Sequence, residues 1–389
     1  MGVFDSLPKE RMLGPLWLLS MVLLACCSCS PWQRLDRSQG WALYALKDRA
    51  VAAAPYRTAF EPAYRSVERD FGPFKEEVRV HVWPTSAPPA SSSRSMQVRR
   101  VPGIGPARIP AWHMGGGGGP ILPRGIYIDT PDMGTAVHEL IHAHMAQHDE
   151  ELPLWFEEGV ASFFGDGVTI GGEWIVDGLS CWPLRELRDN PLTDEQLERL
   201  LSRRSSGQLA ARDDLLLHFV GWAVVYDLAL ETGSRDWRIW RDRIRQGFTL
   251  ASVQERLQRV LRPETEFLWL ERLHDDRAAV RLAAAKGTWK LGRMQVLDLL
   301  MNALEYEADP EVAVGLAVNA LAAAGELRLS QARWGELRAL ILRALASSAL
   351  ADPDESAAVE DLRRAYAGAR SDWHAAQFAM SGLHRFWEE

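Results

Sequence analysis

The chain has few cysteines: only four of its 389 residues are cysteine, and three of these stand together at positions 26, 27 and 29. A disulfide framework needs cysteine partners spread through the fold, so this distribution excludes one. The fourth, Cys181, stands alone, and no second CxxC segment follows the first cluster. A zinc site built on cysteines is therefore not expected.

The chain also lacks an excess of positive charge. Its 44 lysines and arginines face 52 aspartates and glutamates, which gives a formal net charge of −8. Such a surface repels phosphate backbones, so nucleic acid is not expected as a general partner. The hydrophobic share of 47% and the charged share of 25% are typical of globular proteins. The length predicts two or three domains.

The N-terminal residues have the pattern of a secretory signal peptide. Lys9 and Arg11 precede an apolar run from Met12 to Ala25, which is shorter than the roughly 20 residues that a membrane-spanning helix needs. A charged start, a short apolar run and small residues at its end are typical of a cleaved signal. The working domains are therefore expected outside the cytoplasm.

The end of this run, Leu23-Leu24-Ala25-Cys26, resembles the bacterial lipobox, in which the cysteine becomes the lipidated first residue of the mature protein. The resemblance implies that residues 1–25 are removed and that Cys26 anchors the chain to a membrane of the bacterial cell envelope. A plain secretion signal and a short membrane anchor are the alternatives.

The hydrophobic pattern predicts an N-terminal part that mixes helix and strand. Residues 26–39 are interpreted as a polar tether, and the stretch Gly40–Phe71, rich in alanine, leucine and arginine, as a helix. Strands are then expected, with Met96–Val101 as a candidate edge strand because prolines follow it closely. The predicted strands are, in order, Glu77–Trp83, Met96–Val101 and Gly125–Asp129.

Helices dominate the rest of the pattern. One is expected to begin near Asp132, and another to start at Pro153 and run to about Phe164. From Pro183 onward the sequence looks wholly helical, and it includes the strongly apolar stretch Leu215–Thr232.

Beyond residue 267 the helical pattern repeats. Asp276, Val280 and Arg281 begin a unit that is echoed about 33 residues later by Asp309 and Val312. The units resemble HEAT-like repeats, whose helix pairs stack into a solenoid. The resemblance implies an all-α repeat domain over residues 267–389 that offers a surface to a protein partner. An ordinary helical bundle is the alternative.

The segment His138-Glu139-Leu140-Ile141-His142 carries the strongest chemical signal. Residues four apart on an α-helix lie about 40° from each other around the axis, so the two imidazoles project side by side and can share one zinc ion. Glu139 lies on the adjoining stripe, where its carboxylate can reach a zinc-bound water. This arrangement is that of a metalloprotease in which the glutamate is the general base.

The surroundings of this segment resemble the gluzincin superfamily of zinc peptidases, which includes thermolysin-like proteases and neutral aminopeptidases. A predicted strand leads into the HExxH helix, and the next helix carries Trp155-Phe156-Glu157-Glu158-Gly159-Val160-Ala161. In that superfamily the glutamate before the glycine is the third zinc ligand. The resemblance spans about residues 50–235. It implies that Glu158 completes a one-zinc site in an α+β peptidase domain, residues 40–266, with a small mixed sheet and a helical subdomain.

Two other residues are weighed as the third ligand. Glu157 is the fallback, with a solvated charge as its simpler interpretation. His148 has the spacing of the metzincin motif HExxHxxGxxH, but Met145 stands where that motif needs glycine, and in a continuing helix His148 points away from the other imidazoles. Thermolysin-like enzymes place an aspartate four residues after the ligand glutamate; here Ser162 stands there, so no residue that orients the histidines is identified.

The resemblance also implies a tyrosine or histidine on a later helix that stabilises the transition state. The stretch 215–232 offers His218 and Tyr226, of which His218 lies nearer the expected place, although packing alone could account for either. The sequence thus predicts a membrane-tethered zinc peptidase acting on peptide or protein substrates. The alternative is a catalytically idle, zinc-stabilised lipoprotein that binds partners through its repeats. Glu139 argues against idleness because structural zinc needs no base.

Overall fold

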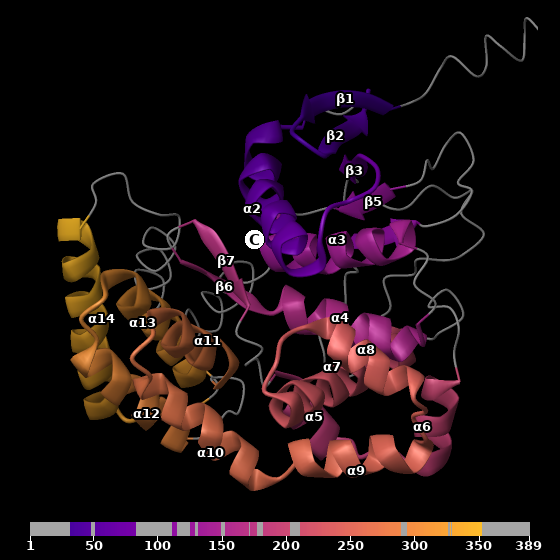
Figure 1. Cartoon of the computed structure of the whole chain (residues 1–389). Helices are drawn as coiled ribbons and strands as arrows, with labels where there is room; N and C mark the ends of the chain where they lie inside the picture. Colours follow the sequence, from indigo (N-terminus) through magenta and orange to yellow (C-terminus); the bar gives the residue numbers. More distant parts are fainter. Residues whose placement is uncertain are drawn as a thin grey trace, which may run out of the picture.

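The computed structural model describes residues 32–47, 51–82, 111–114, 125–128, 131–148, 152–170, 172–176, 182–202, 211–288, 294–325, 327 and 329–351. Over these ranges the chain has a mixed α+β architecture, mostly helical, with one small sheet and a separate hairpin (Figure 1). The predicted α+β class is confirmed at this coarse level. The predicted signal peptide, Cys26 and the candidate strand Met96–Val101 lie outside the described residues.

The sheet has five strands in the order β1-β2-β3-β5-β4. Strand β3 pairs in parallel with β2 and with β5, whereas the edge strands β1 and β4 run antiparallel to their neighbours. The strands predicted near residues 77–83 and 125–129 are confirmed, and the sheet is mixed as expected. The strands are β1 (Trp32–Arg37), β2 (Trp41–Leu46), β3 (Val78–Val82), β4 (Ala111–Met114) and β5 (Gly125–Ile128).

The prediction was wrong at the start of the sheet. Residues interpreted as the end of the tether form β1, and residues interpreted as the start of a helix form β2. Alanine and leucine favour helices in isolation. Because β2 lies between two other strands and is mostly buried, its side chains are apolar on both faces and show no alternation. The helix begins only at Ala53, as α2 (Ala53–Phe71).

Helices α2 and α3 (Met133–Gln147) pack together on one face of the sheet. In the strand register Leu43, Val80 and Ile126 align across β2, β3 and β5, and all three are fully buried. Trp41 points to the same face as Leu43 because it stands two residues earlier. Its ring contacts Phe60 of α2, with 5.8 Å between centroids, so this is the face that α2 covers.

A helical layer follows α3. It begins with α4 (Leu154–Gly165), close to the predicted bounds. A hairpin that was not predicted follows, formed by β6 (Gly167–Ile170) and β7 (Glu173–Val176). The described residues from 182 to 351 are helical apart from short connections, as predicted. Their helices are α5 (Trp182–Asp189), α6 (Asp194–Leu201), α7 (Ala211–Thr232), α8 (Trp237–Arg245), α9 (Leu250–Val260), α10 (Pro263–Glu271), the 3₁₀ helix η2 (Arg272–His274), α11 (Ala278–Thr288), α12 (Met294–Tyr306), α13 (Pro310–Gly325) and α14 (Gln331–Ala351).

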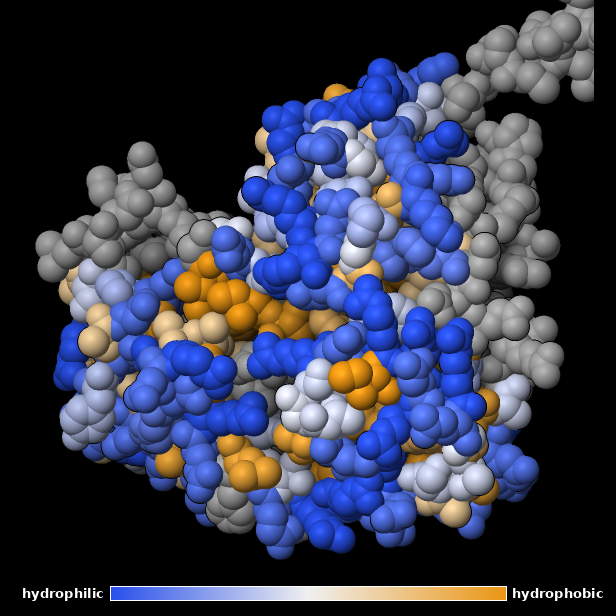
Figure 2. All heavy atoms as spheres, in the orientation of Figure 1, coloured by the Kyte–Doolittle hydropathy of each residue, from blue (hydrophilic) through white to orange (hydrophobic). Residues whose placement is uncertain are grey.

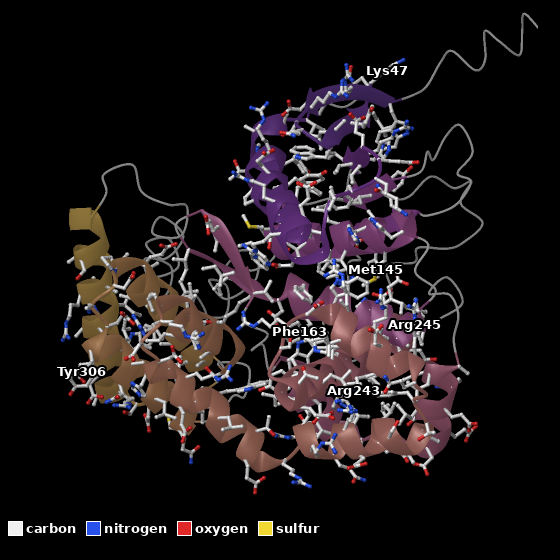
Figure 3. All side chains as sticks on the ribbon, viewed as in Figure 1. Lys47, Met145, Phe163, Arg243, Arg245 and Tyr306 are labelled. Carbon is white, nitrogen blue, oxygen red and sulfur yellow. The ribbon has the colours of Figure 1, made fainter. Side chains whose placement is uncertain are left out.

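Helix α7 is a core helix of this layer. Its stretch Leu215–Thr232 is long and apolar enough to cross a membrane, but 67% of it is buried inside the fold. It packs closely on α4, whose Phe163 is labelled in Figure 3. The Phe163 ring contacts the Trp240 ring of α8 edge-on, with 5.2 Å between centroids. Burial against these neighbours accounts for the apolar composition of α7.

The C-terminal helices are α11 to α14, and α13 packs against each of the other three, whereas α11 and α12 are not close neighbours. The guanidinium of Arg281 binds both carboxylate oxygens of Glu307, at 2.6 and 2.7 Å, and so ties α11 to the connection that follows α12. Tyr306 at the end of α12 is 76% exposed on the outer side of these helices (Figure 3).

Two glycine pairs let α4 approach its neighbours closely. A Cβ atom on Gly159 of α4 would lie 2.4 Å from the carbonyl group of Gly221 in α7. On the other side, a Cβ atom on Gly134 of α3 would lie 2.6 Å from the carbonyl oxygen of Gly165 in α4. Both distances are shorter than any real contact, so α4 can hold this position between α3 and α7 only with glycine at the crossings.

We expect Gly221→Ala to destabilise the protein by about 1–3 kcal/mol, because the added methyl group overpacks the α4–α7 crossing. This outweighs the gain of about 0.5–1 kcal/mol that alanine ordinarily brings to a helix interior. Chemical denaturation measures the difference. The matched control is Gly335→Ala in α14, where no atom lies within 4 Å of the new Cβ and stability should be unchanged or slightly raised. A Gly221→Ala protein as stable as wild type would contradict the close crossing.

Candidate metal centre

The two histidines of the HExxH segment lie side by side on α3. The helix begins where the sequence predicts, because the side chain of Asp132 accepts a hydrogen bond from the Thr135 amide and caps it. The Nε2 atoms of His138 and His142 are 3.1 Å apart, and their rings meet at 68°. Both imidazoles thus present the same nitrogen to one point, as helical spacing requires.

A carboxylate from α4 reaches the same point. Oε2 of Glu158 lies 3.2 Å from Nε2 of His142 and 3.4 Å from Nε2 of His138. The Glu158 side chain is only 8% exposed. The crossing of α3 with α4 therefore brings together the three residues that the sequence analysis assigned to the metal.

A third helix adds His218. Its Nε2 atom lies 2.9 Å from Oε2 of Glu158, and its ring stacks on that of His138 with 5.5 Å between centroids. His218 stands three residues before Gly221, so the close α4–α7 crossing carries it to the site. Tyr226, the alternative, is excluded: its hydroxyl is buried in the core, where it accepts a hydrogen bond from the Trp269 indole.

The ligand atoms of His138, Glu158 and His218 all lie within 4.8 Å of one another, so this group could hold a metal ion. His142 joins it through its short separations from His138 and Glu158. His218 therefore has two chemically sensible roles. It can bind the metal, or it can stay outside the set of metal ligands and donate a hydrogen bond within the site, to Glu158 or to a bound substrate.

Burial and charge set the protonation of the cluster. Burial lowers the pKa of His138 to about 4, so this imidazole is neutral and offers a lone pair. Burial also acts to lower the pKa of His142, but the carboxylates of Glu158 and Glu157 outweigh it and raise this pKa well above its ordinary value. Burial acts to raise the pKa of Glu158, yet His142 and His218 outweigh it, and this pKa lies well below the ordinary value. Glu158 is thus a buried anion, ready to bind a cation.

Glu157 holds the other side of His142. Its Oε1 atom lies 2.8 Å from Nδ1 of His142, and its side chain is 26% exposed. The interpretation of Glu157 as a solvated charge is therefore wrong, and so is its role as a fallback ligand, since it sits at the ring nitrogen turned away from Glu158. An Nδ1–H that donates to Glu157 leaves the Nε2 lone pair free for a metal. In the sequence, only the position of Glu157 directly before Glu158 pointed to a role for Glu157 at His142.

Of the remaining candidate residues, Glu139 lies beside the site, whereas His148 and His144 do not contribute to it. Glu139, the predicted base, lies on α3 beside the ligand histidines and is 6% exposed. His148 ends α3 and contacts the carbonyl oxygen of His144 through Nδ1, so it takes no part in the site and the metzincin alternative has no support. His144 is buried in the core, and its ring packs edge-on against Phe71.

Comparisons with protein-family models, with curated proteins and with solved structures found no match.

We expect Glu157→Ala to lower the affinity for Zn²⁺ by about 10- to 100-fold, because His142 loses the acceptor that orients its ring. Competition with a chromophoric chelator measures the affinity. Glu157→Gln keeps an oxygen at this position and should lose less. The control is Glu264→Ala, an exposed residue of α10 far from the site in sequence. Wild-type affinity in Glu157→Ala would exclude the orienting role.

Proposed function

We propose that this chain is a zinc-dependent peptidase that hydrolyses peptide bonds of peptide or protein substrates outside the cytoplasm. One observation carries the proposal: Oε2 of Glu158, on α4, lies within 3.4 Å of the Nε2 atoms of both HExxH histidines, on α3. Glu139 stands between those histidines in the sequence and gives the site a candidate base, which a purely structural metal site does not need.

The donor set supports zinc. Two imidazole nitrogens and one carboxylate oxygen, from His138, His142 and Glu158, are ligands that catalytic zinc takes, and three protein ligands leave a fourth position open. The contact of Glu157 with His142 adds an orienting partner of the kind that zinc histidines have. When bound, zinc would act as a Lewis acid on the substrate carbonyl and would lower the pKa of a water molecule.

Glu139 is the proposed general base. It follows a ligand histidine directly in the sequence and is buried on the same helix, α3. In the proposed reaction it accepts a proton from the water that attacks the peptide carbonyl. It then returns that proton to the departing amine, which must be protonated before it leaves.

His218 is the proposed stabiliser of the transition state. Its Nε2 atom lies 2.9 Å from Glu158 and its ring is stacked on His138, so it borders the site without belonging to the ligand helices α3 and α4. An imidazole there can donate a hydrogen bond to the oxygen that gains negative charge as the carbonyl is attacked.

The type of peptidase domain, the C-terminal repeat units and the lipid anchor are part of the same proposal. The order of elements supports a gluzincin-like domain: a small mixed sheet leads into the HExxH helix, and a second helix carries the glutamate. The two weakly similar sequence units and the four stacked helices after residue 278, with α13 packed on α11, α12 and α14, support HEAT-like units that bind a protein partner. The lipobox-like segment supports a lipid anchor at Cys26 in the bacterial cell envelope.

Glu139→Gln should keep zinc bound but lower the rate of peptide hydrolysis by about 10²- to 10⁴-fold, because the ligands remain and only the base is lost. Metal analysis of the purified variant and cleavage of a peptide library measure the two properties. The wild-type protein stripped by a chelator is the control and should be inactive until zinc is restored. A wild type that binds zinc yet cleaves nothing would favour the idle binding lipoprotein instead.

His218→Ala should retain zinc and lower kcat by about 10²- to 10³-fold, the usual cost of losing one hydrogen-bond donor to the oxyanion. Steady-state kinetics and metal content are compared with those of His274→Ala, which removes an exposed histidine of η2 and should behave as wild type. If His218→Ala loses zinc as readily as a ligand variant, His218 is a fourth metal ligand and the proposed role is wrong.

A further inference from the structure

The β6–β7 hairpin follows α4 in the chain and packs against α11 of the C-terminal helices. Figure 1 shows the hairpin between α4 and the helices α11–α13, and Figure 2 shows an apolar patch over it on an otherwise mostly hydrophilic face. Val168 and Val176 are buried, one on each strand. The indole of Trp174 in β7 donates a hydrogen bond to the carbonyl oxygen of Phe164, at 3.0 Å, and so satisfies one of the last carbonyl groups of α4.

One side chain from the C-terminal helices reaches this point. The ammonium group of Lys286 in α11 donates a hydrogen bond to the Gly167 carbonyl oxygen at 3.0 Å. The same Nζ atom lies 3.6 Å from Oδ1 of Asp166 and 5.7 Å from the centre of the Trp174 ring. Lys286 thus makes a hydrogen bond and an ion pair with the two residues that follow α4, and a cation–π contact with a residue of β7.

The charges explain why a cation is needed there. Asp166 is the C-cap residue of α4, and its side chain is only 10% exposed. A carboxylate at this end faces the negative pole of the helix dipole, which disfavours it, whereas a cation is favoured. Lys286 therefore compensates both a mostly buried anion and the helix end itself.

The end of α4 touches the metal centre. Gly165, the residue before Asp166, is packed so closely on α3 that a Cβ atom there would lie 3.2 Å from Cβ of His138 and 3.6 Å from its Cα. Glu158 stands seven residues earlier in the same helix, two turns from this contact. A displacement of the α4 C-terminus therefore acts on the backbone of one ligand and on the helix that carries another.

We infer that Lys286 is a positioning residue of the metal centre, and that the C-terminal helices are part of its scaffold rather than an independent module. The inference rests on the proposed function as far as the metal is concerned. Its structural part, the fixing of the α4 C-terminus by α11, stands without it. A partner that binds the C-terminal helices would then have a route to the metal centre through α11 and the hairpin.

The test compares Lys286→Met and Lys286→Arg with wild type in the full chain. Three quantities are measured: Zn²⁺ affinity, hydrogen exchange of the backbone amides of α4, and kcat and KM for one cleaved peptide. Lys286→Met should lower Zn²⁺ affinity by about tenfold, the low end of the effect of changes around metal ligands. It should also speed exchange near residues 162–165, and lower kcat more than it raises KM. Lys286→Arg keeps a cation at this position and should show the wild-type Zn²⁺ affinity, hydrogen exchange and kinetic constants.

Two further variants make the result specific. Arg281 lies in α11, as Lys286 does, and pairs with Glu307, which follows α12. Arg281→Met breaks this ion pair but leaves Lys286 in place, so hydrogen exchange in α4 and Zn²⁺ affinity should stay near wild type. The double variant Asp166→Asn/Lys286→Met removes both charges of the ion pair. It should therefore be closer to wild type than Lys286→Met alone, and it replaces that variant if Lys286→Met fails to fold.

Each outcome decides the matter. Wild-type Zn²⁺ affinity and wild-type α4 exchange in Lys286→Met would overturn the inference, as would equal effects in Arg281→Met, which would indicate general destabilisation of the C-terminal helices. If the wild-type protein binds no Zn²⁺, the proposed function fails, and exchange in α4 alone then tests whether Lys286 fixes this helix.

Discussion

The structure depends on the close packing of α4 between α3 and α7. Each crossing uses a pair of glycines, Gly134 with Gly165 and Gly159 with Gly221, at separations that no side chain permits. Because the helix backbones approach so closely, short side chains on three separate helices meet at one point: the imidazoles of α3, the carboxylate of α4 and the imidazole of α7. The same packing buries α7 and explains why so apolar a helix belongs to a core.

The burial of charged side chains at this point has an energetic cost. Glu139 and Glu158 are both carboxylates in the interior, and a buried anion is costly unless a cation or several donors compensate it. The pKa of Glu158 lies well below its ordinary value and that of His142 well above, because each holds the other in its charged form. A divalent cation bound by these side chains would offset the cost more fully than a shared proton. Glu157 then serves to hold the tautomer of His142 that leaves Nε2 free.

The parts of this site that follow from local geometry were predictable from the sequence. Helical spacing alone places His138 beside His142, and the cap at Asp132 sets the start of their helix. Glu158 required a family resemblance, because no local rule brings a residue of α4 to α3. The contact of Glu157 with His142 and the contacts of Lys286 were not predicted, since they join elements that only the tertiary packing brings together. The helix predicted to include residues 41–46 is not observed for the same reason: the neighbouring strands outweigh the helix propensity of alanine and leucine in β2.

The central claim is that one metal ion binds where α3 and α4 cross. Crystals grown with Zn²⁺ and measured on both sides of the zinc absorption edge test it directly, because the difference map locates zinc alone. The account predicts a single strong peak about 2.0–2.2 Å from Nε2 of His138, Nε2 of His142 and an Oε atom of Glu158. A fully zinc-loaded crystal with no peak at this crossing, or with a peak that His142 does not contact, would contradict it.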